Sequence, residues 1–262
     1  MAEPDPDVIP VPRDHSRARF RTPQTPKTVS IPSGAWDNWI TAAWWVNRTG
    51  SPVTYFRAQW KVPDPPRTDR GQCIFLFNGM QPRPEVGAIL QPVLAWDFDC
   101  SKWGVSSFFV SSLPNMPPPT YPPVPVEPGQ ILTGVIRLID HGGGGFSYRC
   151  EFEGFPGTAL TVHNIPELIY CVVTLEEEEG GCGNTPYELQ APTDYPNARK
   201  TRFRRIKIEL ESGVPLPRLH WVPCNYLEKF PKYFGAHTRV VSRSATHGKV
   251  DIYYARRGCL WW

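Results

Sequence analysis

The sequence predicts an all-β protein, an antiparallel β-sandwich of the concanavalin-like type with a proline-rich N-terminal arm. Three observations lead to this fold class. Short runs of β-branched and aromatic residues recur along the chain, 31 prolines and 21 glycines interrupt it, and helical periodicity is nearly absent. Of the 262 residues, 40% are hydrophobic and 13% are aromatic, which is enough apolar material for a folded core.

The arm is predicted from the density of proline in residues 1–33, at positions 4, 6, 10, 12, 23, 26 and 32. Proline has a fixed φ and no N–H to donate to a neighbouring strand, so we expect an extended segment here. Residues 34–262 are expected to form a single sandwich domain, since sandwiches of this length are commonly one domain.

The strand candidates follow one another with turn residues between them, which is typical of a sandwich or a barrel. Cys73-Ile74-Phe75-Leu76-Phe77 is continuously apolar, as expected for a strand buried on both faces. Residues 225–230 are the only helix candidate, and Pro231 ends it. Residues 238–262 are expected to add a strand or to pack across one sheet. The predicted strands are 40–46, 53–62, 73–77, 88–96, 103–111, 131–139, 146–152, 159–163, 168–175, 203–210 and 250–254.

Two segments between strands have alternative interpretations. The proline-rich stretch 114–128 resembles a ligand of SH3 or WW domains, but inside a sandwich it is better interpreted as a stiff crossing loop. His141-Gly142-Gly143-Gly144-Gly145 resembles the oxyanion loop of lipases. That loop needs a G-x-S-x-G nucleophile turn, which the sequence lacks, so a flexible hairpin is the better interpretation.

Charge, hydropathy and cysteine content exclude several classes of protein. A net charge of +3 argues against nucleic acid as a partner, and no apolar run is long enough to span a membrane. The N-terminus has no secretory leader, so a cytoplasmic protein is expected, or a secreted one if a leader has been removed. Seven cysteines leave at least one unpaired thiol, and a Cys182–Cys224 pair stays open. No cysteine or histidine spacing fits a metal site, so neither a metal nor a cofactor is expected.

Two charged runs are expected to be solvated. Glu176-Glu177-Glu178-Glu179 follows a strand and is interpreted as its exposed end rather than a calcium site, although Glu176 can point inward. The basic run 199–207 contains alternating apolar residues, which favours an exposed strand face over a phosphate-binding site.

The ten tryptophans suggest an aromatic binding surface. Aromatic side chains along a sheet stack on sugar rings or hold apolar groups of a ligand. Some of the ten are expected in the core and two or three in a groove. The predicted substrate-binding residues are Trp39, Trp60, Trp96, Trp103 and Tyr170.

Several landmarks, taken in order, resemble the glutamic peptidases of the eqolisin family. They are Asn38-Trp39, the segment 56–63 that ends in Val-Pro, Phe75-Leu76-Phe77-Asn78-Gly79, Ala88-Ile89-Leu90-Gln91 with Trp96 after it, and the segment 126–131. The resemblance covers about residues 38–210 and implies an eqolisin-like β-sandwich with one curved sheet that faces the ligand. It also implies that Gln91 is the catalytic glutamine, which stabilises an oxyanion while a glutamate activates water.

The catalytic glutamate has no direct counterpart. The resemblance aligns Tyr170 with it, and strand alternation puts Tyr170 and Glu176 on one face. Either a local bulge lets Glu176 replace the missing carboxylate, or the pair is broken and the chain is a relative without peptidase activity. Asp97 and Asp99 are further carboxylate candidates beside Gln91.

Three hypotheses about function follow. The first is a hydrolase that acts on a peptide-like substrate with Gln91 and Glu176 in an aromatic-lined groove. The second is a non-catalytic, lectin-like module that binds a glycan or another small molecule. The third is a non-hydrolytic enzyme, such as a cyclase, that acts on a small metabolite in the same groove.

Overall fold

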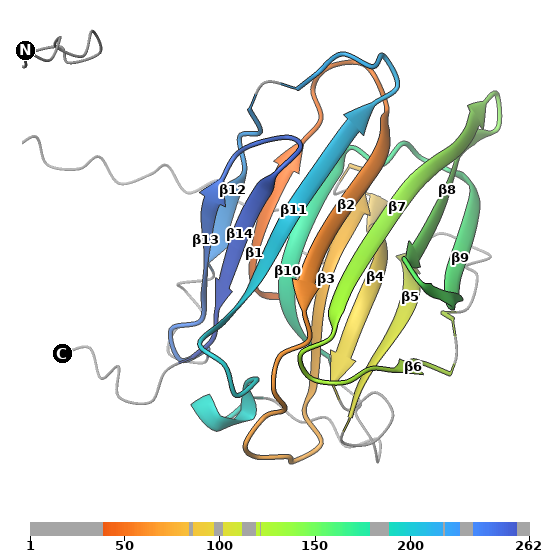
Figure 1. Cartoon of the computed structure of the whole chain (residues 1–262). Helices are drawn as coiled ribbons and strands as arrows, with labels where there is room; N and C mark the ends of the chain where they lie inside the picture. Colours follow the sequence, from red (N-terminus) through yellow and green to blue (C-terminus); the bar gives the residue numbers. More distant parts are fainter. Residues whose placement is uncertain are drawn as a thin grey trace, which may run out of the picture. The chain divides into compact units, whose positions relative to one another are not determined.

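The described residues form two antiparallel seven-stranded sheets that stack as two layers (Figure 1). The predicted all-β sandwich is therefore confirmed. The described residues include the short 3-10 helix η2 (Pro192–Asp194), and none of their helices is long and apolar enough to cross a membrane. The computed structural model describes residues 39–83, 86–96, 102–111, 119–120, 122–178, 189–216, 218–225 and 233–255.

The first sheet has the strand order β12-β1-β10-β3-β4-β5-β6. We call its face toward the other sheet the inner face and the opposite one the outer face. Its strands are β12 (Val222–Asn225), β1 (Trp39–Val46), β10 (Tyr170–Glu178), β3 (Cys73–Gln81), β4 (Ala88–Trp96), β5 (Trp103–Ser111) and β6 (Val124–Pro125).

The second sheet has the strand order β13-β14-β11-β2-β7-β8-β9 and covers the inner face of the first, with β4 against β7 and β5 against β8 and β9. Its strands are β13 (His237–Ser242), β14 (Gly248–Tyr253), β11 (Lys200–Leu210), β2 (Val53–Lys61), β7 (Ile131–Gly142), β8 (Gly145–Phe152) and β9 (Phe155–Ile165).

Every strand predicted from the sequence is present, although several extend further than expected. β3 and β4 are buried along their whole length, which confirms a central strand with apolar residues on both faces. The glycine run at 142–145 is the predicted hairpin, because Gly142 pairs with Gly145 at its end.

Three short strands were not predicted individually. β6 lies in the proline-rich connector and pairs with Gly104 and Val105 at the sheet edge, where a proline is tolerated. β12 also contains a proline and also lies at an edge. β13 pairs with β14, so the C-terminal segment adds strands to the second sheet, as expected. The predicted arm 1–33 lies outside the described residues, and so does the helix candidate 225–230 apart from Asn225 in β12.

The core between the sheets contains one buried amide. Asn78 on β3 is fully buried, and its two amide atoms have no partner among the described residues. It faces Gly134 on β7, where an added Cβ would stand 2.4 Å from Asn78 Oδ1 and 2.8 Å from Pro92 Cγ. The two sheets therefore approach closely here because position 134 has no side chain.

Candidate ligand-binding face

Gln91, the predicted catalytic glutamine, projects from the outer face of the first sheet. Its neighbours Leu90 and Leu94 belong to the core between the sheets, and side chains alternate along β4. The Gln91 side chain therefore points away from that core, although the residue is only 3% exposed.

A second glutamine lies beside Gln91. The pairs Phe77–Val93 and Met80–Leu90 place Gln91 level with Gly79 on β3, two residues from Gln81. Diagonal neighbours on adjacent strands have Cα atoms about 7–8 Å apart, so the two glutamine side chains reach the same region of the outer face. We call Gln81 and Gln91 the amide pair.

The amide pair contains one buried acceptor and one buried donor that are unsatisfied. Gln91 Oε1 and Gln81 Nε2 are both inaccessible to solvent and have no hydrogen-bond partner among the described residues. A buried polar atom without a partner costs about 1–3 kcal/mol. The molecule therefore carries a local energetic cost at this position.

Half-buried aromatic side chains flank the amide pair on both sides. Phe108 on β5 stands directly opposite Gln91, and Tyr170 on β10 stands directly opposite Gln81. Trp44 on β1 packs against Tyr170 with ring centroids 5.8 Å apart and an interplanar angle of 49°. The outer face thus has a polar centre between two aromatic borders.

The structure does not bring Glu176 to Gln91. Glu176 is half-buried on the same outer face, but it pairs with Phe75 on β3, which in turn pairs with Ala95 on β4. Ala95 lies four residues along β4 from Gln91, and Glu176 lies two strands across the sheet from Ala95. The Cα atoms of Gln91 and Glu176 are therefore about 17 Å apart. The β10–β3 register runs without a shift from Tyr170 to Glu178, so the bulge needed to move Glu176 is not present.

The predicted aromatic platform is divided between two parts of the molecule. Tyr170 lies on the outer face, and so does Trp39, whose ring meets Phe77 edge-on at 6.2 Å. The other three members belong to the core between the sheets, where no ligand on the outer face can reach them. They are Trp60, Trp96 and Trp103.

The sequence suggested that the carboxylates of the Glu176–Glu179 run are solvated. The structure shows that they are not all solvated. Glu177 is 8% exposed and lies on the face of β10 opposite to Glu176. Its carboxylate accepts hydrogen bonds from Leu189 N and from the Tyr233 hydroxyl, both at 3.2 Å. Glu177 therefore ties β10 to the chain at Leu189 and at Tyr233 and plays no part on the outer face. The structure does not describe the side chain of Glu178. Glu179 and the further candidates Asp97 and Asp99 lie outside the described residues.

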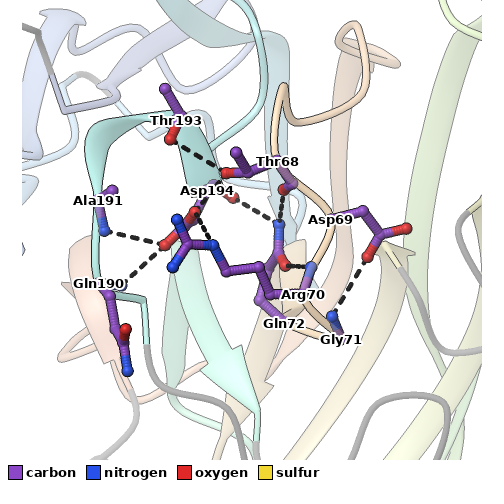
Figure 2. A network of polar contacts seen from close by, with 9 residues as sticks. All are labelled: Thr68, Asp69, Arg70, Gly71, Gln72, Gln190, Ala191, Thr193 and Asp194. Carbon is purple, nitrogen blue, oxygen red and sulfur yellow. Dashed lines mark hydrogen bonds and ion pairs between the residues drawn. The ribbon is translucent and has the colours of Figure 1, made fainter.

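A second buried carboxylate, which the sequence did not single out, organises two loops (Figure 2). Asp194 in η2 is fully buried and accepts hydrogen bonds from Gln190 N and Ala191 N at 2.9 Å and from the Thr68 hydroxyl at 2.5 Å. Arg70 Nε lies 3.8 Å from it. The chain on either side of η2 is thereby held to the loop between β2 and β3. Only the tertiary structure reveals this role, because the partners are distant in sequence.

No group of His, Cys, Asp and Glu side chains among the described residues is arranged to hold a metal ion.

Comparison with known proteins finds likeness in structure only. No family model matches the chain, and no curated protein matches it. Two structures of scytalido-glutamic peptidase, one with a peptide-based transition state analog and one with a transition state analog inhibitor, are similar with 13% and 12% identity and TM-scores of 0.49 and 0.48. SCP-B, a member of the eqolisin family in a complex with the tripeptide Ala-Ile-His, is similar with 12% identity and a TM-score of 0.43. Each match covers 83% of this chain and 98% of the other chain.

These solved structures belong to the class of protein that the sequence landmarks resemble. At such identities and TM-scores the likeness carries no assignment of residues or activity.

Proposed function

We propose that the outer face of the first sheet binds an extended, peptide-like ligand at the amide pair. The observation that carries this proposal is the unsatisfied acceptor Gln91 Oε1 beside the unsatisfied donor Gln81 Nε2. A peptide backbone presents N–H donors and C=O acceptors, which are the two kinds of group that this pair lacks.

The spacing of the amide pair matches an extended chain. Gln81 lies two residues along β3 from the level of Gln91, which corresponds to about 6.8 Å along the strand. The backbone groups on one edge of an extended peptide recur every two residues, at the same spacing. One extended segment can therefore bond both glutamines once their buried amide atoms turn toward it.

The aromatic borders favour side chains of a peptide over sugar rings. Trp44 and Tyr170 are tilted by 49° to one another and do not form a flat stacking surface. Such tilted rings enclose an apolar side chain, whereas a sugar stacks on an open ring face. Phe108 closes the other side of the amide pair and gives the next ligand side chain an apolar neighbour.

The position of Glu176 favours binding over hydrolysis. If the two residues acted on one reacting group, the Glu176 carboxylate would have to reach, directly or through one water, the group that Gln91 contacts, and a Cα separation of about 17 Å exceeds that reach. An extended ligand that runs along β4 from Gln91 reaches the level of Glu176 after four residues. We assign Glu176 to recognition of a basic or hydrogen-bonding ligand group at that level.

A retention experiment with defined peptides tests this proposal. Wild-type protein, Gln91→Leu and the control Gln190→Leu are immobilised in equal amounts, exposed to a tryptic digest of casein and washed. The retained peptides are then quantified by mass spectrometry. Gln190 is an exposed glutamine away from the first sheet's strands, so its substitution matches the chemistry without touching the amide pair.

Wild-type protein and Gln190→Leu are expected to retain the same subset of peptides. Gln91→Leu should retain about tenfold less of it, because one hydrogen bond to a buried partner is lost. Equal retention by the wild type and Gln91→Leu would overturn the proposal. Cleavage of intact casein at acidic pH that disappears in both Gln91→Leu and Glu176→Gln would replace binding with hydrolysis.

A further inference from the structure

Two adjoining pockets lie where β11 begins, on the second sheet and away from the amide pair. One has a volume of about 370 Å³ and is lined by residues of β2, β7 and β11 and of the loops before and after them. The other has a volume of about 350 Å³ and is lined by Arg67, Arg199 and the segment 192–198. Ala198 borders both, and each pocket alone has the size of a small-molecule site.

Four cationic side chains line the first pocket. Lys200, Arg202 and Arg204 alternate with buried residues along β11 and therefore project from the outer face of the second sheet. Lys61 comes from β2, two residues beyond Gln59, which pairs with Arg204. The basic run 199–207 was expected to be an exposed strand face. Three of its cations line a pocket instead.

The charges of these cations are only partly compensated. Asp251 binds Lys200 and holds Arg202 through two contacts, at 2.5 Å to Nε and 2.8 Å to Nη2. Lys61 and Arg204 make no ion pair with any described residue. Asp64 is the one carboxylate among the lining residues, and Asp251 lies behind them as the partner of Lys200 and Arg202. Four cations against two carboxylates leave an excess of two positive charges.

The remaining lining is apolar apart from Thr201, and it is firmly held. Val62, Pro63 and Ile131 supply an apolar wall beside the cations. The opposite wall, around Ala198, is fixed because Asn197 N donates to Asp64 O at 3.1 Å and Asp194 clamps the preceding residues to the β2–β3 loop (Figure 2). The pocket is therefore formed in advance and needs little ordering when a ligand enters.

We propose that this pocket binds the phosphate group of a small phosphorylated organic molecule. A phosphate monoester carries about −1.5 to −2 charges at pH 7, which matches the uncompensated excess, whereas a single carboxylate supplies half of it. The guanidinium of Arg204 offers the planar pair of N–H donors that suits phosphate oxygens. The apolar wall accounts for an organic substituent beside the phosphate.

Isothermal titration of the full-length protein with phenyl phosphate, at fixed ionic strength, tests this inference. The variants are Lys61→Gln, Arg204→Gln and the control Arg149→Gln. Arg149 lies on β8 of the same sheet, outside the pocket, and is paired with Glu151, so the control removes an equal charge elsewhere. Benzoate, which has a similar ring and one negative charge, is the comparison ligand.

Saturable binding of phenyl phosphate is expected in the wild type and in Arg149→Gln, with about tenfold weaker binding in Arg204→Gln and in Lys61→Gln. Benzoate should bind at least about tenfold more weakly than phenyl phosphate. Absence of saturable binding, equal weakening by the control, or equal affinity for benzoate would each overturn the inference. A failure here leaves the amide pair on the first sheet untouched, because the two sites share no residue.

Discussion

At the scale of single residues, Asp251 shows how opposing effects set a charge state. Burial raises the pKa of the Asp251 carboxyl, but hydrogen bonds from Arg202 and Lys200 and their positive charges outweigh burial and hold this pKa below its ordinary value. The side chain is 1% exposed, while its partners remain partly in solvent. The carboxylate is therefore a fixed anion that orients two of the four cations in the proposed phosphate pocket, which we call the basic pocket.

Substitution Asp251→Asn should lower the free energy of unfolding by about 2 kcal/mol at pH 7, less than the 3–5 kcal/mol for a fully buried pair. Because the folded-state pKa is depressed, the stabilisation is present above the unfolded value near pH 4 and is lost as pH falls through the folded value. Urea unfolding of both proteins between pH 7 and pH 2.5 measures this. Parallel pH profiles for wild type and variant would contradict it.

At the scale of strands, the close approach of β7 to β3 and β4 depends on Gly134. An added Cβ would meet Asn78 Oδ1 at 2.4 Å, Pro92 Cγ at 2.8 Å and a Trp60 ring carbon at 3.0 Å. Two of these neighbours belong to the first sheet, so relieving the contacts requires the sheets to move apart.

Gly134→Ala is therefore expected to lower the free energy of unfolding by about 1–3 kcal/mol through overpacking, although alanine suits a strand better than glycine. Gly142→Ala is the matched control, since nothing lies within 4 Å of its added Cβ, and it should change stability by less than about 0.5 kcal/mol. Thermal and urea unfolding of both variants provide the comparison. A Gly134→Ala protein as stable as the wild type would show that the sheets are less tightly packed than described.

The positions of the strands can be predicted from the sequence, but the register between strands that are distant in sequence cannot. Strand positions were predictable because short apolar runs lie between turn residues. The outer-face direction of the Gln91 side chain follows from strand alternation, because Leu90 and Leu94 on β4 belong to the core. The offset between Gln91 and Glu176 was not predictable, since it depends on the register of β10 against β3, which are distant in sequence. Strand alternation predicts that Trp60 shares one face of β2 with Phe56 and Ala58, but it does not show whether that face is the inner one. The structure places all three in the core.

At the scale of the whole molecule, the two sheets present outer faces with different chemistry. The first sheet carries the amide pair between aromatic borders, and the second carries alternating charged residues and the basic pocket. The inner faces share one continuous apolar core. A ligand on one outer face therefore need not disturb the other.

Cys150 and Cys171 report on the integrity of that core, because both are fully buried in it and burial raises the pKa of each thiol well above its ordinary value. Neither thiol is expected to react with iodoacetamide in native buffer over an hour, and both should react within minutes in 8 M urea, about the concentration that exposes a sandwich core. Mass spectrometry of the digested protein identifies the alkylated positions. Rapid native alkylation of Cys150 would contradict a closed, cooperative sandwich.

The most direct test of the account concerns the oxygen atom of Gln91. If this amide is a ligand contact that the folded chain leaves unsatisfied, then Gln91→Leu should raise the free energy of unfolding by about 1 kcal/mol. It should also reduce the stabilisation that added casein peptides give the wild type, by up to about 1.4 kcal/mol for tenfold weaker binding. Urea unfolding of the two proteins, each with and without the peptides, measures both effects. A Gln91→Leu protein that is less stable than the wild type, yet equally stabilised by peptides, would show that the amide supports the fold and does not bind the ligand.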